Sequence, residues 1–362
     1  MRNKGIVWTV AGLWLLLALA AWVLPAQDLS VSERRPLAQM PELEAEALLN
    51  GAFMSDFEAY SLDQFPLRDT FRRFKSLFHY NILHQRDNNG IYIADGMAVK
   101  QEYPLNTDSI DHAASRFQNI YDRYLQQSDV YFAIVPDKGY YLAEGSGHLS
   151  LNCHQMTQLL QQKLPWAQFV DLTDTLSAED YYHTDTHWRQ EHLLEAASKL
   201  CSAMGIQPPN PEDYEQVPLE QPFYGVYYGQ AALPMDPETI YLMESDSLKD
   251  CTVYDFETGK TGEIYDRTKL TSKDLYDVYL SGAKSLLAIE NPNAETDREL
   301  IIFRDSFGSA ISPLLVNGYA KVTLVDIRYI QSSMLPMYLD FHGQDVLFLY
   351  STLVLNNSET IK

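Results

Sequence analysis

From about residue 107 onwards, the chain alternates short apolar runs with longer amphipathic segments, and this alternation limits the folds open to it. Residues 130–135 and 299–304 are near-continuous apolar runs, typical of strands that are buried on both faces of a sheet. Residues 109–127, which precede the first of these strands, have apolar side chains at helical spacing. Because strands that alternate with helices favour parallel pairing, we predict an α/β fold with a doubly wound, mostly parallel sheet and helices on both faces.

Two further segments set the predicted domain organisation. Residues 28–105 combine a polar link, a helical segment and a β-hairpin that turns at Asp95-Gly96. Residues from about 206 to 283 are polar, aromatic and rich in proline, which favours a loop-rich subdomain inserted into the α/β pattern. We therefore expect an N-terminal anchor over 1–27, the segment 28–105, and an α/β domain over 106–362 that contains the insertion.

The N-terminus has the features of a membrane anchor. An apolar run from Gly5 to about Ala26 is long enough to cross a hydrocarbon core of about 30 Å as a helix. Because Arg2 and Lys4 precede it, the rest of the chain is expected outside the cytoplasm, as a single-pass protein of the cell membrane. Residues 18–20 also fit a signal-peptidase site, and cleavage there would give a secreted protein. We favour the uncleaved anchor, because cleavage would leave apolar residues at the mature end.

Charge and cysteine content exclude some classes of function. The chain has 27 basic and 49 acidic residues and a net charge of −22, which repels nucleic acid backbones. We therefore expect no nucleic acid partner. Cys153, Cys201 and Cys251 lie in no zinc-finger spacing; we interpret them as buried apolar side chains, although one disulfide remains open.

Ser306 is the first candidate for chemistry. It follows the predicted strand 299–304 and precedes a helical run, and ligands of open α/β sheets bind at the carboxyl ends of the strands. The G-x-S-x-G motif of many serine hydrolases is absent, because position 304 is Arg. Alternatively, Asp305 and Ser306 could serve only as caps at the N-terminus of the helix.

The second candidate is the stretch YYHTDTHW, residues 181–188. On an extended segment, Asp185 and His187 project to the same side, so the carboxylate could orient the imidazole as a base for a serine. His183, Asp185 and His187 would also share one face, as zinc ligands could. A structural turn is the third possibility, and spacing alone leaves all three open.

The combination of YYHTDTHW with FRDSFGS, residues 303–309, resembles the DHHW proteins of Gram-positive bacteria. It is more distantly similar to the SGNH-hydrolase-like domain of alginate O-acetylation proteins of the AlgJ and AlgX type. In these proteins a D-x-H-W motif precedes a D-S-[FY] motif. The resemblance implies an SGNH-hydrolase-like fold with Ser306 as nucleophile, His187 as general base and acid, and Asp185 as its orienting carboxylate, and it disfavours a metal.

The same resemblance implies a function. It suggests an extracytoplasmic, membrane-anchored acetyltransferase or esterase that acts on cell-envelope polysaccharide without a cofactor. A membrane-bound O-acyltransferase would be the partner that supplies the acyl group. Two departures are Thr186, where DHHW proteins usually have a second His, and Arg304, where SGNH enzymes have Gly. Arg304 leaves open a non-catalytic, glycan-binding or scaffold protein with the same fold.

Five further residues are candidates for binding substrate or an oxyanion. Lys138, Arg328 and Tyr329 follow predicted strands, and so would lie at the same sheet edge as Ser306. Asn291 also ends a predicted strand and could donate to an oxyanion, as could Arg304 beside the serine. Each could equally be structural, as an ion pair, a turn residue or a buried polar group.

Overall fold

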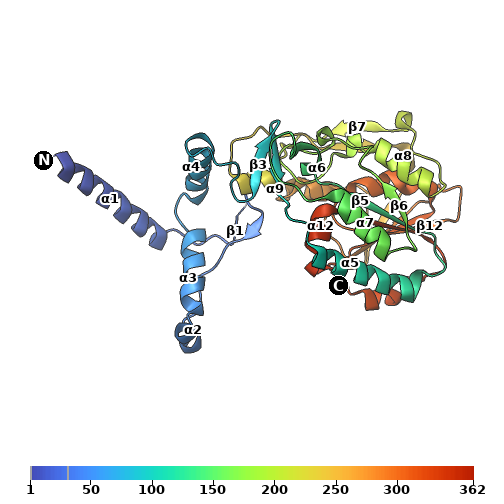
Figure 1. The fold of residues 1–362 in the computed structure, drawn as a ribbon, viewed down its shortest axis with the longest axis horizontal. Coiled ribbons are helices and arrows are strands. Elements are labelled where there is room, and N and C mark those ends of the chain that lie inside the picture. Colours follow the sequence, from blue (N-terminus) through green and yellow to red (C-terminus); the bar gives the residue numbers. More distant parts are fainter. Residues whose placement is uncertain (1, 31) are drawn as a thin grey trace. The chain divides into compact units, whose positions relative to one another are not determined.

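The computed structural model describes residues 2–30 and 32–362. The chain forms two compact units, and Figure 1 shows their elements. The first unit contains Met1–Asn89 together with Tyr228–Met235. The second contains Gly90–Tyr227 and Asp236–Lys362.

The first unit is helical. Its helices are α1 (Arg2–Val23), α2 (Ala45–Asn50), α3 (Ala52–Asp63) and α4 (Arg68–Asn81), and a short antiparallel pair is formed by β1 (Leu29–Ser30) and β2 (Arg35–Pro36). Residues Lys4–Val23 of α1 are long and apolar enough to span a membrane, with a mean hydropathy of 2.2 and no part of the helix buried. The expected N-terminal apolar helix is therefore present.

The second unit is built on an eight-stranded sheet with the order β10-β9-β11-β13-β12-β14-β5-β6. Its strands are β5 (Val130–Val135), β6 (Gln168–Asp171), β9 (Thr252–Asp255), β10 (Lys260–Gly262), β11 (Leu286–Glu290), β12 (Glu299–Arg304), β13 (Lys321–Val325) and β14 (Asp345–Ser351). The five strands from β13 to β6 pair in parallel, which confirms the predicted α/β sheet.

The other three strands are antiparallel. β11 runs against β13, which lies between β11 and β12 in the sheet. Only residues 291–298 join β11 to β12, and a parallel crossover needs about a dozen residues or more. The short connection therefore forces the reversal of direction.

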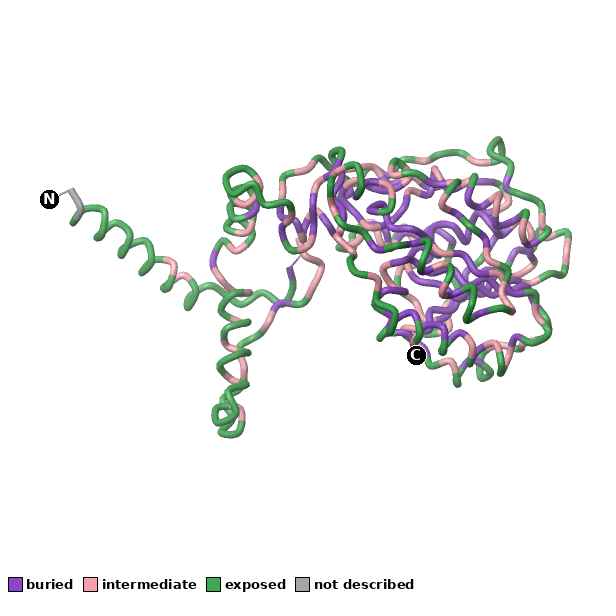
Figure 2. Tube along the Cα trace, viewed as in Figure 1, coloured by how far each residue is buried: buried purple, intermediate pink, exposed green. Residues whose placement is uncertain are grey.

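Two hydrophobic cores lie on the two faces of the sheet. Successive side chains of β14 alternate between them, with Leu347 and Leu349 in one core and Phe348 in the other. The Phe348 core includes side chains of α5 (Thr107–Ile120), α7 (Cys153–Lys163) and α12 (Thr352–Asn356). The opposite core includes those of α8 (Leu194–Ala203) and α11 (Gly308–Ile311). Helices therefore cover both faces, as predicted, and the central strands β5, β12, β13 and β14 are mostly buried, whereas the edge strand β10 is exposed (Figure 2).

The remaining elements are short. The predicted hairpin is formed by β3 (Ile91–Ala94) and β4 (Met97–Lys100), and it belongs to the second unit. Asp95 and Gly96 have positive φ angles of 47° and 79° at its turn. The other elements are α6 (Gly139–Leu142), β7 (Glu215–Pro218), α9 (Val226–Ala231), β8 (Tyr241–Glu244) and α10 (Asp246–Lys249). β9 and β10 fall within the predicted insertion at 206–283 but extend the main sheet.

Candidate active site

Ser306 lies where the sequence predicts it, just beyond the carboxyl end of β12 and before α11. The carboxylate of Asp305 fixes this turn, because Oδ1 accepts a hydrogen bond from the Phe307 N–H at 3.0 Å and Oδ2 accepts one from the Ser351 N–H at 2.8 Å. Ser351 ends the neighbouring strand β14. Asp305 thus ties the serine turn to the sheet. The Ser306 hydroxyl can form a hydrogen bond with another group.

The Ser306 hydroxyl meets the histidine that the sequence pairs with it. Ser306 Oγ lies 2.7 Å from His187 Nε2, across 119 positions of sequence. His187 Nδ1 lies 2.6 Å from Asp185 Oδ1. Asp185 is completely buried and His187 is 8% exposed. The three side chains form a continuous Ser-His-Asp relay in which the carboxylate can hold the imidazole in one tautomer.

The loop that carries Asp185 and His187 differs from the extended segment that we expected. Residues 183–187 form a bend that is closed by an antiparallel bridge between Tyr181 and Trp188. Asp185 Oδ1 accepts hydrogen bonds from both the His187 backbone N–H, at 3.0 Å, and the ring. The pair is therefore brought together by an Asx-type turn, which a two-residue spacing permits as readily as a strand does.

Lys138 supports this loop through hydrogen bonds from its ammonium group. Its Nζ donates to the backbone carbonyls of Tyr182, His183 and Asp185 at 2.7, 3.2 and 2.8 Å. Lys138 follows β5 at the expected sheet edge, but it is completely buried, and burial lowers the pKa of its ammonium group to about 8. The suggestion that Lys138 contacts substrate is therefore wrong, and its contacts are structural.

The predicted insertion supplies three more contacts, which sequence reasoning missed. Asp185 Oδ2 accepts a hydrogen bond from the Val226 N–H at 2.7 Å. The carboxylate of Glu238 accepts from the backbone N–H groups of His183 and Thr184 at 2.7 and 2.8 Å. These partners lie more than 40 positions from the loop, and their sequence surroundings carry no signal that would have identified them.

Gly225 is part of the same contact. A Cβ at this position would lie 2.3 Å from the Cβ of Asp185 and from the backbone carbonyl of Thr184. The Gly225 N–H also donates to Thr184 Oγ1 at 2.9 Å. Only glycine allows the two segments to approach this closely.

Aromatic rings enclose the imidazole. The Tyr276 ring stacks on His187 with centroids 4.0 Å apart and an interplanar angle of 10°, and Phe307 lies 5.1 Å away. Trp188 is completely buried and donates from Nε1 to the Phe307 carbonyl at 3.1 Å, which joins the histidine loop to the serine turn. Burial raises the pKa of the Tyr276 hydroxyl well above its usual value, so this group stays neutral beside the base.

Arg304 is buried beneath the serine turn. Its guanidinium makes long hydrogen bonds to the carbonyls of Asp305 and Lys284, at 3.4 and 3.5 Å, and lies 3.9 Å from Asp326. A Cβ on Gly308 would lie only 2.6 Å from Arg304 Cβ. Arg304 is therefore a packed residue of the interior, and we do not assign it an oxyanion role.

The other three candidates are placed differently. Arg328 follows β13 at the expected edge, but it forms a paired contact with Asp326 through Nε and a terminal nitrogen, at 2.9 and 2.6 Å. Tyr329 is 54% exposed and lies beneath the Arg328 guanidinium. Asn291 follows the antiparallel β11, so it lies at the opposite edge of the sheet from Ser306. Its amide donates to the Val316 and Tyr319 carbonyls, and the suggested oxyanion role is wrong.

Within residues 2–30 and 32–362, no group of three or more His, Cys, Asp or Glu side chains is placed to hold a metal ion. Cys153, Cys201 and Cys251 are buried free thiols. Burial raises the pKa of Cys153 and Cys201 to about 12, so both remain neutral thiols in the core.

The parallel sheet with a serine turn after a central strand and a histidine loop beside it is an SGNH-hydrolase-like α/β fold, as the sequence resemblance implied. A scan of protein-family models gives no match, and a search of curated protein sequences gives none either.

Solved structures do match. A DHHW family protein from Eubacterium siraeum is 24% identical, with a TM-score of 0.61 over 76% of this chain and 95% of that one. PatB1 of Bacillus cereus is 18% identical, with a TM-score of 0.59 over 75% of this chain and 98% of that one. The same PatB1 has also been solved with a sulfonyl adduct. At these identities the likeness shows the fold, which is the one that the resemblance to DHHW proteins predicted.

Proposed function

We propose that this protein is a serine-dependent acyltransferase or esterase in which Ser306 is the nucleophile, His187 the general base and acid, and Asp185 the orienting carboxylate. The distance of 2.7 Å between Ser306 Oγ and His187 Nε2 carries the proposal. A serine hydroxyl is a weak nucleophile on its own and requires an adjacent base of this kind.

The proposed reaction has two steps. Ser306 Oγ attacks the carbonyl carbon of an acyl ester as His187 Nε2 takes its proton, and the departing alcohol receives that proton from His187. This leaves an acyl group on Ser306. His187 then deprotonates a sugar hydroxyl or a water, which attacks the acyl-enzyme, and Ser306 Oγ recovers the proton. We propose the Ser306 backbone N–H as a donor to the oxyanion in both steps.

The substrate class that we propose is a cell-envelope polysaccharide carrying or receiving acetyl groups. The resemblance of YYHTDTHW and FRDSFGS to DHHW and alginate O-acetylation proteins supports this choice. The apolar helix α1 supports a location on the outer face of a membrane. A membrane-bound O-acyltransferase as the source of the acyl group remains part of the proposal. Exclusion of water from the second step would decide between transferase and esterase.

A sulfonyl fluoride tests the nucleophile, since PatB1 forms a sulfonyl adduct. The full chain in detergent is treated with phenylmethanesulfonyl fluoride, and the modified peptide is identified by mass spectrometry. We expect one adduct at Ser306, absent from Ser306→Ala and strongly reduced in His187→Ala. Ser309→Ala is the matched control, because Ser309 is a buried serine only three residues further along the chain, in α11.

Turnover of 4-nitrophenyl acetate is measured on the same variants. Loss of turnover in Ser306→Ala and His187→Ala, with wild-type rates in Ser309→Ala, is the expected pattern. A wild-type chain with neither adduct nor turnover would instead favour the non-catalytic, glycan-binding or scaffold role.

A further inference from the structure

Helix α4 of the first unit presents its apolar side chains to the outside. Leu67, at its N-cap, is followed at spacings of three or four residues by Phe71, Phe74, Phe78 and Ile82, which places all five on one side of the helix. Their exposed fractions are 67, 45, 70, 42 and 62%. We refer to these five residues as the α4 stripe.

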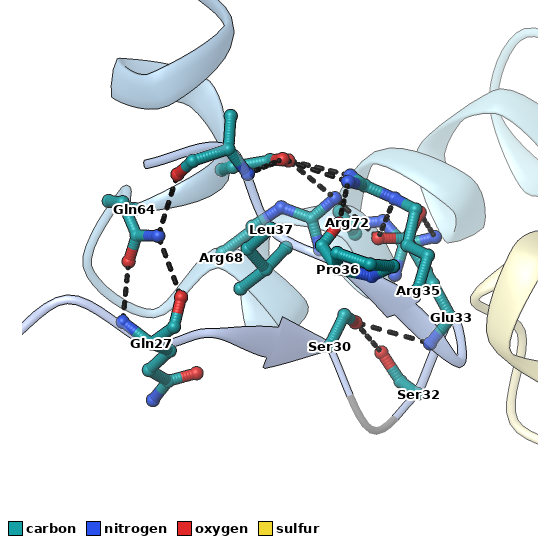
Figure 3. Close-up of polar contacts among 12 residues, drawn as sticks. Gln27, Ser30, Ser32, Glu33, Arg35, Pro36, Leu37, Gln64, Arg68 and Arg72 are labelled. Atoms are coloured by element: carbon teal, nitrogen blue, oxygen red, sulfur yellow. Dashed lines mark hydrogen bonds and ion pairs between the residues drawn. The ribbon is translucent and has the colours of Figure 1, made fainter. Parts of the chain in front are cut away.

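The polar side of α4 faces inward instead. Arg72 donates to the Gly229 carbonyl at 2.8 Å, and the buried Ser76 donates to the Ala231 carbonyl at 2.7 Å. Glu33 pairs with both Arg68 and Arg72, as Figure 3 shows. A helix on the surface of a water-soluble domain normally has the reverse orientation, so the exposed α4 stripe indicates that an apolar phase covers it.

The α4 stripe borders an open groove of about 810 Å³ whose lining is mixed, because the ion-paired Glu33, Asp63 and Arg68 line it beside apolar side chains. Phe71 and Phe74 line this groove together with Leu62 and Phe65. Phe65 and Phe71 meet edge to face with centroids 5.5 Å apart, so their rings hold one another at the surface. The apolar surface is therefore wider than a single row of side chains.

Hydrogen bonds tie the C-cap of α3, which lies shortly before α4, to a residue just after the candidate membrane helix. The Gln27 N–H donates to the Gln64 side chain at 2.8 Å, and Gln64 Nε2 donates back to the Gln27 carbonyl at 2.9 Å (Figure 3). Gln27 follows the end of α1, at Val23, by four residues, and Gln64 precedes Arg68, the first residue of α4, by four. If α1 crosses a membrane, α4 begins within a few residues of the point where the chain leaves it.

The charges beside the α4 stripe suit an anionic surface. α4 contains four basic residues, Arg68, Arg72, Arg73 and Lys75, and one acidic residue, Asp69, whereas the whole chain has a net charge of −22. Lys75 is exposed and follows Phe71 by four residues, so it borders the stripe, and a long basic side chain there can reach lipid headgroups while the helix lies at the acyl boundary. Arg73 follows Asp69 by four residues, lies on the other side of α4 and donates to the Tyr228 hydroxyl at 3.1 Å. Attraction to anionic lipid would amount to a few-fold in affinity for each exposed charge.

We propose that α4 lies on the surface of an anionic phospholipid bilayer, with the α4 stripe among the acyl chains and Lys75 at the headgroups. This contact is separate from the span formed by α1. It would hold the first unit against the membrane, and it does not depend on the proposed reaction at Ser306.

Depth measurements on the full chain test the proposal. Phe74→Cys and Asp69→Cys carry a nitroxide label and are reconstituted in nanodiscs of phosphatidylcholine with phosphatidylglycerol. Asp69 is the matched control, because it lies on the other side of α4 and is exposed. Cys153, Cys201 and Cys251 are buried, so labelling of the folded chain is directed to the new cysteine. We expect oxygen to relax the label at position 74 more than a water-soluble nickel chelate does, and the reverse at position 69.

Three results would overturn the proposal. Equal access of the nickel chelate to both positions would mean that the α4 stripe stays in water. A label at position 74 that neither reagent reaches would mean that protein, such as a second copy, covers it. Amide hydrogen exchange gives an independent readout: we expect slower exchange in α4 in anionic discs than in pure phosphatidylcholine discs, and a smaller difference in Lys75→Gln. No difference in the wild-type chain would also contradict the proposal.

Discussion

At the scale of single residues, the candidate site depends on the state of one imidazole. His187 must present an unprotonated Nε2 to Ser306. The Asp185 carboxylate lies 2.6 Å from Nδ1 and can hold the ring proton on that nitrogen. Asp185 also accepts from the Val226 N–H, so it is fixed before it orients the ring.

Asp185→Asn tests whether His187 must be oriented by a carboxylate or needs only a side chain of similar size at position 185. The amide has one acceptor oxygen, so it keeps only part of the contacts that the two carboxylate oxygens make with the His187 and Val226 N–H groups. An amide NH2 that faces Nδ1 favours the wrong tautomer of His187, and we expect turnover of 4-nitrophenyl acetate to fall about 10³- to 10⁴-fold. Asp180→Asn is the control, because Asp180 pairs with a different histidine, His192. A fall of less than tenfold in Asp185→Asn would mean that His187 is oriented by other groups.

Lys138 allows a second test at this scale. Lys138→Met would remove the donor to the buried Tyr182 and Asp185 carbonyls, whereas the His183 carbonyl would keep the Ala98 N–H. We therefore expect the free energy of unfolding to fall by about 1 to 3 kcal/mol. Urea denaturation followed by tryptophan fluorescence measures this change.

The matched control is Lys199→Met, since Lys199 forms a partly exposed pair with Asp174 and its loss should change stability by less than about 1 kcal/mol. Turnover should fall in Lys138→Met more than the unfolded fraction explains. Wild-type stability and turnover would show that the loop does not need the lysine.

At the scale of elements, the sequence was informative where patterns are local. The strand before Ser306, the hairpin at Asp95-Gly96 and the pairing of Asp185 with His187 all rest on short spacings, and the structure has each of them. The direction of β11 could also have been predicted, because eight residues between two strands are too few for a parallel crossover.

Long-range contacts could not be predicted. Gly225 and Glu238 reach the histidine loop from more than 40 positions away, and nothing in their neighbours distinguishes them from ordinary loop residues. Lys138 was placed at the correct edge, but a sequence does not show whether a lysine there points outward or into the interior. Burial, which decides that question, depends on the packing of the whole second unit.

Gly225→Ala tests the contact between these elements. The new methyl group would lie 2.3 Å from Asp185 Cβ, so one of the two segments must shift. We expect a loss of stability of about 1 to 3 kcal/mol and a larger relative loss of turnover, because the displaced residue is Asp185. Gly262→Ala is the control, since no atom lies within 4 Å of the corresponding methyl position. Equal effects of the two substitutions would contradict this role of Gly225.

At the scale of the whole molecule, α1 and the basic residues Arg2 and Lys4 are the basis for a prediction of where the chain is located. We predict a single-pass protein with the N-terminus in the cytoplasm and residues 28–362 outside. In membrane vesicles of known orientation, protease added from the outer side should digest the second unit, whereas protease added from the cytoplasmic side should leave it intact.

Mass spectrometry of the protein extracted from membranes distinguishes the anchor from a cleaved signal. We expect residues 1–27 to be retained and the protein to be released by detergent but not by high salt. A soluble protein that begins shortly after residue 20 would show that the segment is a signal peptide and that the chain is secreted.

The contacts of Gly225, Val226, Glu238 and Tyr276 have a consequence for engineering. All four lie in the segment between α8 and β11, which the sequence alone suggests to be an accessory insertion, yet they touch the loop or the ring of the proposed base. In a chimera that carried this segment from another protein, the contacts that position His187 would also come from that protein. The segment therefore could not be exchanged as a separate module without changing the alignment of the relay.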